Sequence, residues 1–121
     1  MLEVTIHEED AIAVLEPHGA LTQQDFEAAV TIIDPFIDRR GKLHGIMIHT
    51  KGFPGWDSFS AMLTHMKFVR DHHTKIERVA MVTDSVVGDL AGVVSDHFVQ
   101  AEVKHFKFNE FKQARLWLLG L

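Results

Sequence analysis

The sequence predicts an α/β fold built on a mixed, mostly parallel sheet of five strands with four main helices. Two short apolar runs, at residues 46–48 and 79–82, are typical of strands buried on both faces of a parallel sheet. Segments with apolar residues at helical spacing follow both runs. The expected element order is ββαβαβαβα, in a single domain of residues 1–121.

The N-terminal segment is predicted to form an antiparallel hairpin. Residues 3–7 alternate between polar and apolar side chains, residues 8–10 form an acidic turn, and residues 11–15 are a second apolar run. Two short strands around a three-residue turn are typical of a hairpin. Pro17 ends the second strand, because proline has no N–H for further pairing. The first strand should therefore be the antiparallel member of the sheet.

The first helix is expected to begin at Thr22, which forms a capping-box-like pair with Asp25. Pro35 lacks an N–H and clashes with the preceding turn of a helix. We therefore expect a break there, with Asp34 capping a separate final turn that ends at Gly41. The apolar residues at helical spacing before the break are Phe26, Ala29, Val30 and Ile33.

A loop of glycine and aromatic residues follows the strand at 46–48. Residues 52–56 read Gly-Phe-Pro-Gly-Trp, and Asp57 or Ser58 can cap a helix that runs to about His73. The loop that leaves the carboxyl end of a strand is the usual ligand position in an open α/β sheet. The alternative is that the aromatic side chains of this loop only fill the top of the core.

The strand at 79–82 is also followed by polar residues, Thr83-Asp84-Ser85, and then by a predicted helix at 87–97. Gly88 and Gly92 lie on one face of that helix. They could admit a ligand, although close packing of the helix on the sheet explains them as well.

The C-terminal part is predicted to be an alternating strand at 102–107 and a helix capped by Asn109. The helix ends in a run of apolar residues, 116–121, that cannot all face inward on one amphipathic helix. Leu116 or Leu119 is therefore a candidate for an exposed contact in a homodimer. The expected buried stripe of the helix is Phe111, Ala114, Trp117, Leu118 and Leu121.

Composition excludes several classes of protein. The chain has no cysteine, which excludes disulfides and zinc sites made of cysteine. A chain of 121 residues is long enough to bury about two-thirds of its unfolded surface.

The acidic, alternating N-terminus is not a targeting peptide, and no apolar stretch approaches the roughly 20 residues of a membrane span. We therefore expect a cytoplasmic protein. The net charge of −5 argues against nucleic acid as a partner.

Three lysines near the C-terminus, Lys104, Lys107 and Lys112, are the local exception to the acidic balance. We interpret them as charges that keep an edge strand and a helix face soluble.

Motifs for catalysis and cofactors are absent from the sequence. It contains no P-loop, no G-x-G-x-x-G after a strand and no G-x-S-x-G. Ser58, His49 and Asp84 are the residue types of a catalytic triad, but no motif connects them. Asp57 and Asp84 could form an acid–base pair if their strands are neighbours, although helix capping explains both. We expect no enzymatic activity and no cofactor.

The nine histidines do not have the spacing of a metal site. His65 and His72 share a predicted helix face but lie about 10.5 Å apart along the axis, too far to share one ion. His44 and His49 fall on opposite faces of one strand. We therefore expect no bound metal.

The element order over residues 2–119 and three local stretches, 55–56, 77–84 and 106–118, resemble the SpoIIAA-like proteins. These are small bacterial domains related to the STAS domains of anti-sigma-factor antagonists. The resemblance implies a sheet covered by helices, with a functional loop at the start of the second long helix. Some members are similar to lipid-carrying CRAL-TRIO domains, which implies an apolar ligand rather than a reaction.

The chain departs from the pattern of the antagonists at that loop. They carry Asp-Ser, then a phosphorylated Ser or Thr and a Gly, whereas Asp57-Ser58 is followed here by Phe59 and Ser60. Ser58 or Ser60 is a candidate for phosphorylation, which would place negative charge at a helix N-terminus.

From these observations we expect a non-enzymatic domain that binds a small hydrophobic, lipid-like ligand at the carboxyl edge of the sheet. The alternative is a STAS-like regulator that docks a partner protein through the same edge, under control of serine phosphorylation. Phe53, Trp56 and Phe59 would form the apolar mouth of this site. Gly88 would leave room on the neighbouring helix, and Asp84 and Ser85 would form a polar rim.

Overall fold

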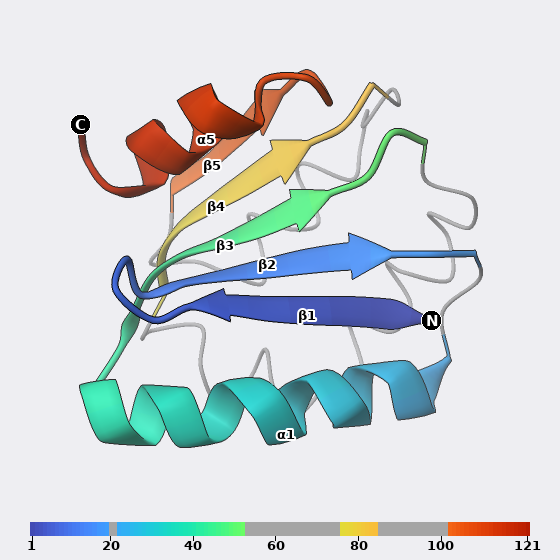
Figure 1. Cartoon of the computed structure of the whole chain (residues 1–121), viewed down its shortest axis with the longest axis vertical. Helices are drawn as coiled ribbons and strands as arrows, with labels where there is room; N and C mark the ends of the chain where they lie inside the picture. Colours follow the sequence, from blue (N-terminus) through green and yellow to red (C-terminus); the bar gives the residue numbers. More distant parts are fainter. Residues whose placement is uncertain (20–21, 53–75, 85–101) are drawn as a thin grey trace.

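A computed structural model of the chain describes residues 1–19, 22–52, 76–84 and 102–121 (Figure 1). Two of the four predicted helices, at 57–73 and 87–97, lie outside these residues. Neither of the two described helices is long and apolar enough to cross a membrane. The described elements are β1 Leu2–His7, β2 Ile12–Pro17, α1 Gln23–Arg40, β3 Leu43–His49, β4 Ile76–Val82, β5 Glu102–Phe106 and α5 Phe111–Leu118.

The five strands form one sheet in the order β1-β2-β3-β4-β5, so each strand pairs with its neighbour in the sequence. β1 is antiparallel to β2, and all other pairs are parallel. This confirms the predicted mixed, mostly parallel sheet. Helix α1 covers one face and α5 covers the other (Figure 1).

The β1–β2 hairpin has a regular antiparallel register from Leu2↔Pro17 to His7↔Ile12. Met1 and His18 exchange both backbone hydrogen bonds, at 2.9 and 2.7 Å. Hydrogen-bonded and non-hydrogen-bonded pairs alternate along an antiparallel ladder, and the pair next to Met1 and His18 is Leu2 with Pro17. The backbone polar positions of Pro17 therefore point toward β3 and not toward β1. The pairing of β2 with β3 ends earlier, at Leu15↔Ile48, so the missing N–H of the proline breaks no ladder bond.

Helix α1 begins as the sequence predicts. Thr22 and Asp25 form a capping box, and the backbone N–H of Thr22, donated to the Asp25 carboxylate, lowers the pKa of that group. Gly41 ends the helix with a φ of 87°, and its N–H donates to the Ile37 carbonyl at 2.6 Å.

The predicted break at Pro35 is wrong, because α1 continues through this residue to Arg40. Proline cannot donate to the carbonyl four residues earlier in the helix. Because Pro35 is exposed, that carbonyl lies on the outer side of α1. The buried residues before and after it share one face against the sheet: Ala29, Ile33, Phe36 and Ile37. Burying Phe36 and Ile37 contributes about 1.5–3 kcal/mol each, enough to offset the roughly 3 kcal/mol cost of the proline.

Each face of the sheet has its own hydrophobic cluster. The larger cluster lies between α1 and the sheet and includes Ile33, Ile37, Ile46 and Val79. The second lies under α5 and includes Met47, Val82, Ala114 and Leu118. Because Gly45 of β3 has no side chain, Leu118 can approach closely, and a Cβ there would lie only 2.5 Å from its Cδ2 atom.

Two details of α5 differ from expectation. Its N-cap is Glu110 and not Asn109, and the Glu110 side chain does not cap the helix. The carboxylate of Glu110 instead accepts the N–H of Lys107 at 2.8 Å, within the turn before the helix. Leu121 is not part of the buried stripe but is 85% exposed, since the helix has ended at Leu118. Leu116 is exposed, as expected for one of the two leucines, while Leu119 packs against the second cluster.

Candidate functional site at the carboxyl edge of the sheet

The chain segments that leave β3 and β4 lie side by side at the carboxyl edge of the sheet. The N–H of Thr50 donates to the Val82 carbonyl at 3.1 Å, which extends the ladder one residue beyond β3. The N–H of Asp84 then donates to the Lys51 carbonyl at 3.2 Å. We call residues 50–52 and 83–84 the paired junctions. Their contact confirms that the two strands are neighbours, the condition under which their following loops can face each other.

Two buried threonines hold the paired junctions in shape. The hydroxyl of Thr83 donates to the Lys51 carbonyl at 3.3 Å, and this residue is only 1% exposed. The hydroxyl of Thr50 donates to the Gly52 carbonyl at 3.0 Å. Hydroxyl groups bonded to loop carbonyls satisfy polar groups that would otherwise be costly to bury. The start of each loop is therefore fixed by internal hydrogen bonds.

The connection from β5 to α5 is tied to the same edge. The N–H of Thr83 donates to the Phe106 carbonyl at 2.9 Å, and Nε2 of His105 donates to the Thr83 carbonyl at 2.8 Å. The N–H of Phe108 donates to Oδ1 of Asp84 at 3.0 Å. Asp84 is thus exposed at this edge, and one of its carboxylate oxygens accepts a hydrogen bond from the β5–α5 connection.

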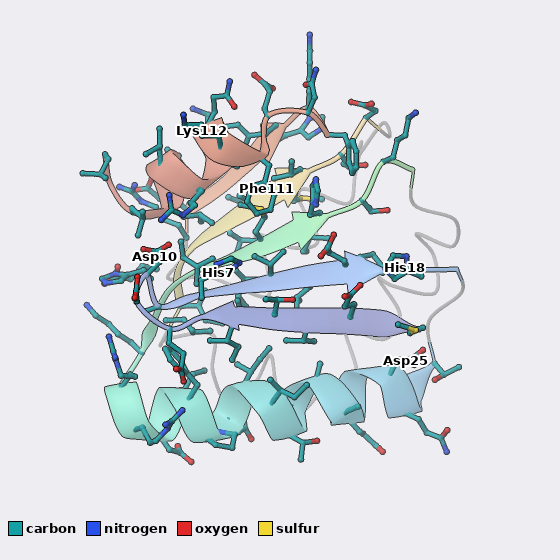
Figure 2. The ribbon with its side chains drawn as sticks, viewed as in Figure 1. His7, Asp10, His18, Asp25, Phe111 and Lys112 are labelled. Carbon is teal, nitrogen blue, oxygen red and sulfur yellow. The ribbon has the colours of Figure 1, made fainter. Side chains whose placement is uncertain are left out.

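His49, the last residue of β3, lies at the centre of this edge. Its ring stacks on Phe108 with a centroid distance of 4.4 Å and an interplanar angle of 5°, and Phe111 contacts it edge-on at 5.0 Å. Figure 2 shows Phe111 directed from α5 toward the sheet. Nδ1 lies 3.3 Å from Oε2 of Glu16, and Nε2 lies 3.3 Å from the Phe108 carbonyl oxygen.

Both ring nitrogens of His49 therefore face oxygen acceptors. A neutral imidazole has one N–H and can donate to only one of them, whereas an imidazolium donates to both. This arrangement joins the ends of β2 and β3 to the β5–α5 connection. It gives no support to the triad of Ser58, His49 and Asp84, because the carboxylate beside His49 belongs to Glu16 and Ser58 lies outside the described residues.

Sequence reasoning missed the role of His49 as a structural centre. Its two polar partners are 33 and 59 residues away in the sequence, so no local pattern could reveal them. Its position at the end of a buried strand was the only available signal. Of the predicted site residues, only Asp84 lies in the described part of the chain. The others, Phe53, Trp56, Phe59, Ser85 and Gly88, together with Ser58, lie outside it.

The amino edge of the same sheet carries an exposed ionic cluster. The ammonium of Lys42 and the Nδ1 atom of His44 both contact the carboxylate of Glu77, at 2.5 and 3.1 Å. The hydrogen bond from Lys42, followed by that from His44, lowers the pKa of Glu77. Among the described residues, no group of three or more histidine, aspartate or glutamate side chains is arranged to hold a metal ion.

Comparison with known proteins gives one match. The model of the SpoIIAA-like family matches residues 12–119, which is most of the chain. No curated protein and no solved structure matches it. The matched range includes β2 to α5, and therefore the whole of the carboxyl edge described above.

Proposed function

Because the chain belongs to the SpoIIAA-like family, we propose that it is a non-enzymatic regulatory domain whose partner protein docks on the carboxyl edge of the sheet. Domains of this STAS type are generally regulators that interact with other proteins. The observation that carries the proposal is the contact between the paired junctions, where Asp84 N–H donates to the Lys51 carbonyl. Loops that begin from a fixed, shared position can present one combined surface.

Three further features support this edge as the docking surface. Lys51 and Gly52 are exposed at the end of β3, and Asp84 is exposed at the end of β4, so charges of both signs are available there. Phe53 and Trp56 follow Gly52 directly in the sequence, and aromatic residues are enriched at the energetic centre of protein interfaces. Ser58, a few residues later, is the proposed site at which phosphorylation controls docking.

Affinity capture of partners from a lysate of the source cells tests this proposal. Lys51→Glu and Trp56→Ala should each reduce retention of a specific partner by at least tenfold, because both alter the proposed surface. Lys112→Glu is the matched control, since Lys112 is an exposed lysine on α5 and should not affect retention. Equal retention by all three variants would contradict docking at the carboxyl edge.

The second candidate function is binding of a small hydrophobic, lipid-like ligand at the same edge. It is favoured by the sequence, which places Phe53, Trp56 and Phe59 just after β3, with Asp84, Ser85 and Gly88 available after β4. Native mass spectrometry of the purified protein should then show a bound apolar molecule. Fluorescence of Trp56, isolated by Trp117→Phe, should shift on addition of fatty acid.

These two candidates give different results. A bound lipid and a fluorescence shift, without a retained protein, would favour the small ligand. A retained protein that is lost in Trp56→Ala, with no bound lipid, would favour the regulatory partner. Turnover of a substrate that is abolished by Ser58→Ala would contradict a non-enzymatic role altogether.

A further inference from the structure

The connection between β5 and α5, residues 107–109, lies at the carboxyl edge next to the paired junctions (Figure 1). β4 pairs in parallel with β3 on one side and with β5 on the other. Continued by two residues beyond the strands, these two registers bring Lys51, Asp84 and Phe108 into line. The connection is therefore the segment that follows the paired junctions on the β5 side of the edge.

Asp84 is bonded to the segments on both of its sides. Its N–H donates to the Lys51 carbonyl at 3.2 Å, and Oδ1 of its carboxylate accepts the Phe108 N–H at 3.0 Å. One residue earlier, the hydroxyl of Thr83 donates to the Lys51 carbonyl, while its N–H donates to the Phe106 carbonyl. The paired junctions and the β5–α5 connection therefore form one hydrogen-bonded unit.

His49 fixes the position of the connection from the end of β3. Its ring stacks on the Phe108 ring at a centroid distance of 4.4 Å, and Nε2 lies 3.3 Å from the carbonyl oxygen of the same residue. Nδ1 faces the Glu16 carboxylate at 3.3 Å, and this contact sets the orientation of the imidazole. Because a stacked ring and a polar contact both act on Phe108, they hold it in one position.

The two residues that flank Phe108 have exposed side chains. Lys107 and Asn109 are both exposed at this edge. The N–H of Lys107 donates to the Glu110 carboxylate at 2.8 Å, but this bond involves only the backbone of Lys107. The connection therefore presents an ammonium group and a side-chain amide on a backbone that the fold holds in place.

A protein that docks on the paired junctions covers more than these two segments. A stable interface takes about 800 Å² on each partner, which is a patch roughly 30 Å across. Neighbouring strands lie about 4.8 Å apart, so two of them span a small part of such a patch. Toward β2, the pairing with β3 has already ended at Leu15↔Ile48. Toward β5, hydrogen bonds continue beyond the strands, so the surface is continuous on that side.

We propose that residues 107–109 form a third part of the docking surface, and that His49 is the residue that positions them. This inference rests on the docking function proposed above and adds a defined contact to it, made by Lys107 and Asn109. The partner that fits is a folded protein surface with carboxylate or carbonyl oxygens opposite Lys107, because an ammonium group can only donate hydrogen bonds. His49 itself does not touch the partner and acts through Phe108.

A photo-crosslinking label tests the contact. The chain has no cysteine, so Asn109→Cys provides the only thiol for a benzophenone maleimide. In a lysate of the source cells, this labelled protein should crosslink the same partner that affinity capture retains. Asp38→Cys, at an exposed position near the end of α1, is the control and should not crosslink that partner. A retained partner that is crosslinked equally from both positions, from neither or from the control alone overturns the inference.

Lys107→Glu tests the same contact by affinity, with the crosslinked partner purified and titrated by calorimetry. The reversed charge should weaken binding by about tenfold or more, whereas Lys112→Glu, an exposed lysine on α5, should leave it unchanged. Loss of binding in Lys51→Glu without loss in Lys107→Glu overturns this inference and leaves docking on the paired junctions intact. A lysate from which the native chain retains no specific protein contradicts both.

His49→Ala tests how the connection is held. It should weaken binding about tenfold, and adding Lys107→Glu should then cost at most about threefold more, because the contact is already displaced. If His49 only stabilised the fold, the two losses would multiply to about a hundredfold, since independent effects add in free energy. Multiplied losses, or unchanged binding in His49→Ala, overturn the positioning role. Circular dichroism checks that each variant is folded at the temperature of the titration.

Discussion

His44 and His49 belong to the same strand, and each contacts a glutamate, yet their surroundings differ. At the amino edge, the side chain of His44 is 47% exposed and contacts Glu77 beside Lys42. At the carboxyl edge, the side chain of His49 is 15% exposed and is stacked on Phe108. Exposed ion pairs contribute about 0–1 kcal/mol, whereas buried polar networks contribute more and impose one geometry. The comparison suggests that β3 is fixed most firmly at the edge assigned to binding.

The sharpest test of this difference is to replace each histidine by alanine. His49→Ala should lower the free energy of unfolding by about 2–3 kcal/mol, because it removes ring stacking and two polar contacts and leaves Glu16 unpaired. His44→Ala is the matched change on the same strand and should cost at most about 0.5 kcal/mol. Urea denaturation monitored by circular dichroism measures both. Similar values for the two variants would remove the distinction between the edges.

Asp84 provides a smaller effect at the carboxyl edge. Asp84→Ala removes the acceptor of the Phe108 N–H and should lower the free energy of unfolding by about 1 kcal/mol. Asp84→Asn keeps an oxygen in place and should be nearly neutral. Denaturation curves of the two variants separate the hydrogen bond from the charge. A loss of equal size in both would show that the carboxylate charge, and not its acceptor role, is the stabilising feature.

The amino edge should show the smallest effect, and one that depends on pH. The folded-state pKa of Glu77 is lowered from 4.5, so its contribution is fully present above pH 4.5 and is lost as the pH falls through the folded-state pKa. Because Glu77 is nearly half exposed, Glu77→Gln should cost only about 0.5 kcal/mol or less at pH 7. The difference from the native protein should shrink below pH 4.5, as measured by urea denaturation across the acid range. A difference that grows with acidity would contradict this assignment.

Much of the fold could be predicted because its signals are local. The capping box at Thr22 and Asp25, the glycine after Arg40 and the alternation in β1 are set by neighbouring residues. Pro35 was misjudged because its cost is local, whereas the burial of Phe36 and Ile37 that offsets it depends on the sheet. At Pro35, tertiary packing of α1 on the sheet outweighs the low helix propensity of proline.

The candidate site was less predictable than the fold. The sequence places polar residues after β3 and β4, but only the strand order brings Lys51 and Asp84 into contact. The position of His49 between Glu16 and Phe108 depends on three separate segments meeting at one edge. Such contacts between distant segments leave no periodic pattern in a single sequence.

Hydrogen exchange on the isolated complex tests most directly whether the carboxyl edge is the binding edge. The protein would be captured with its bound partner or ligand, and amide exchange compared with that of the free chain. We predict slower exchange in peptides containing residues 50–60 and 83–88, with α1 and the outer side of α5 unchanged. Protection confined to α1 or α5, with these two segments unaffected, would contradict the account.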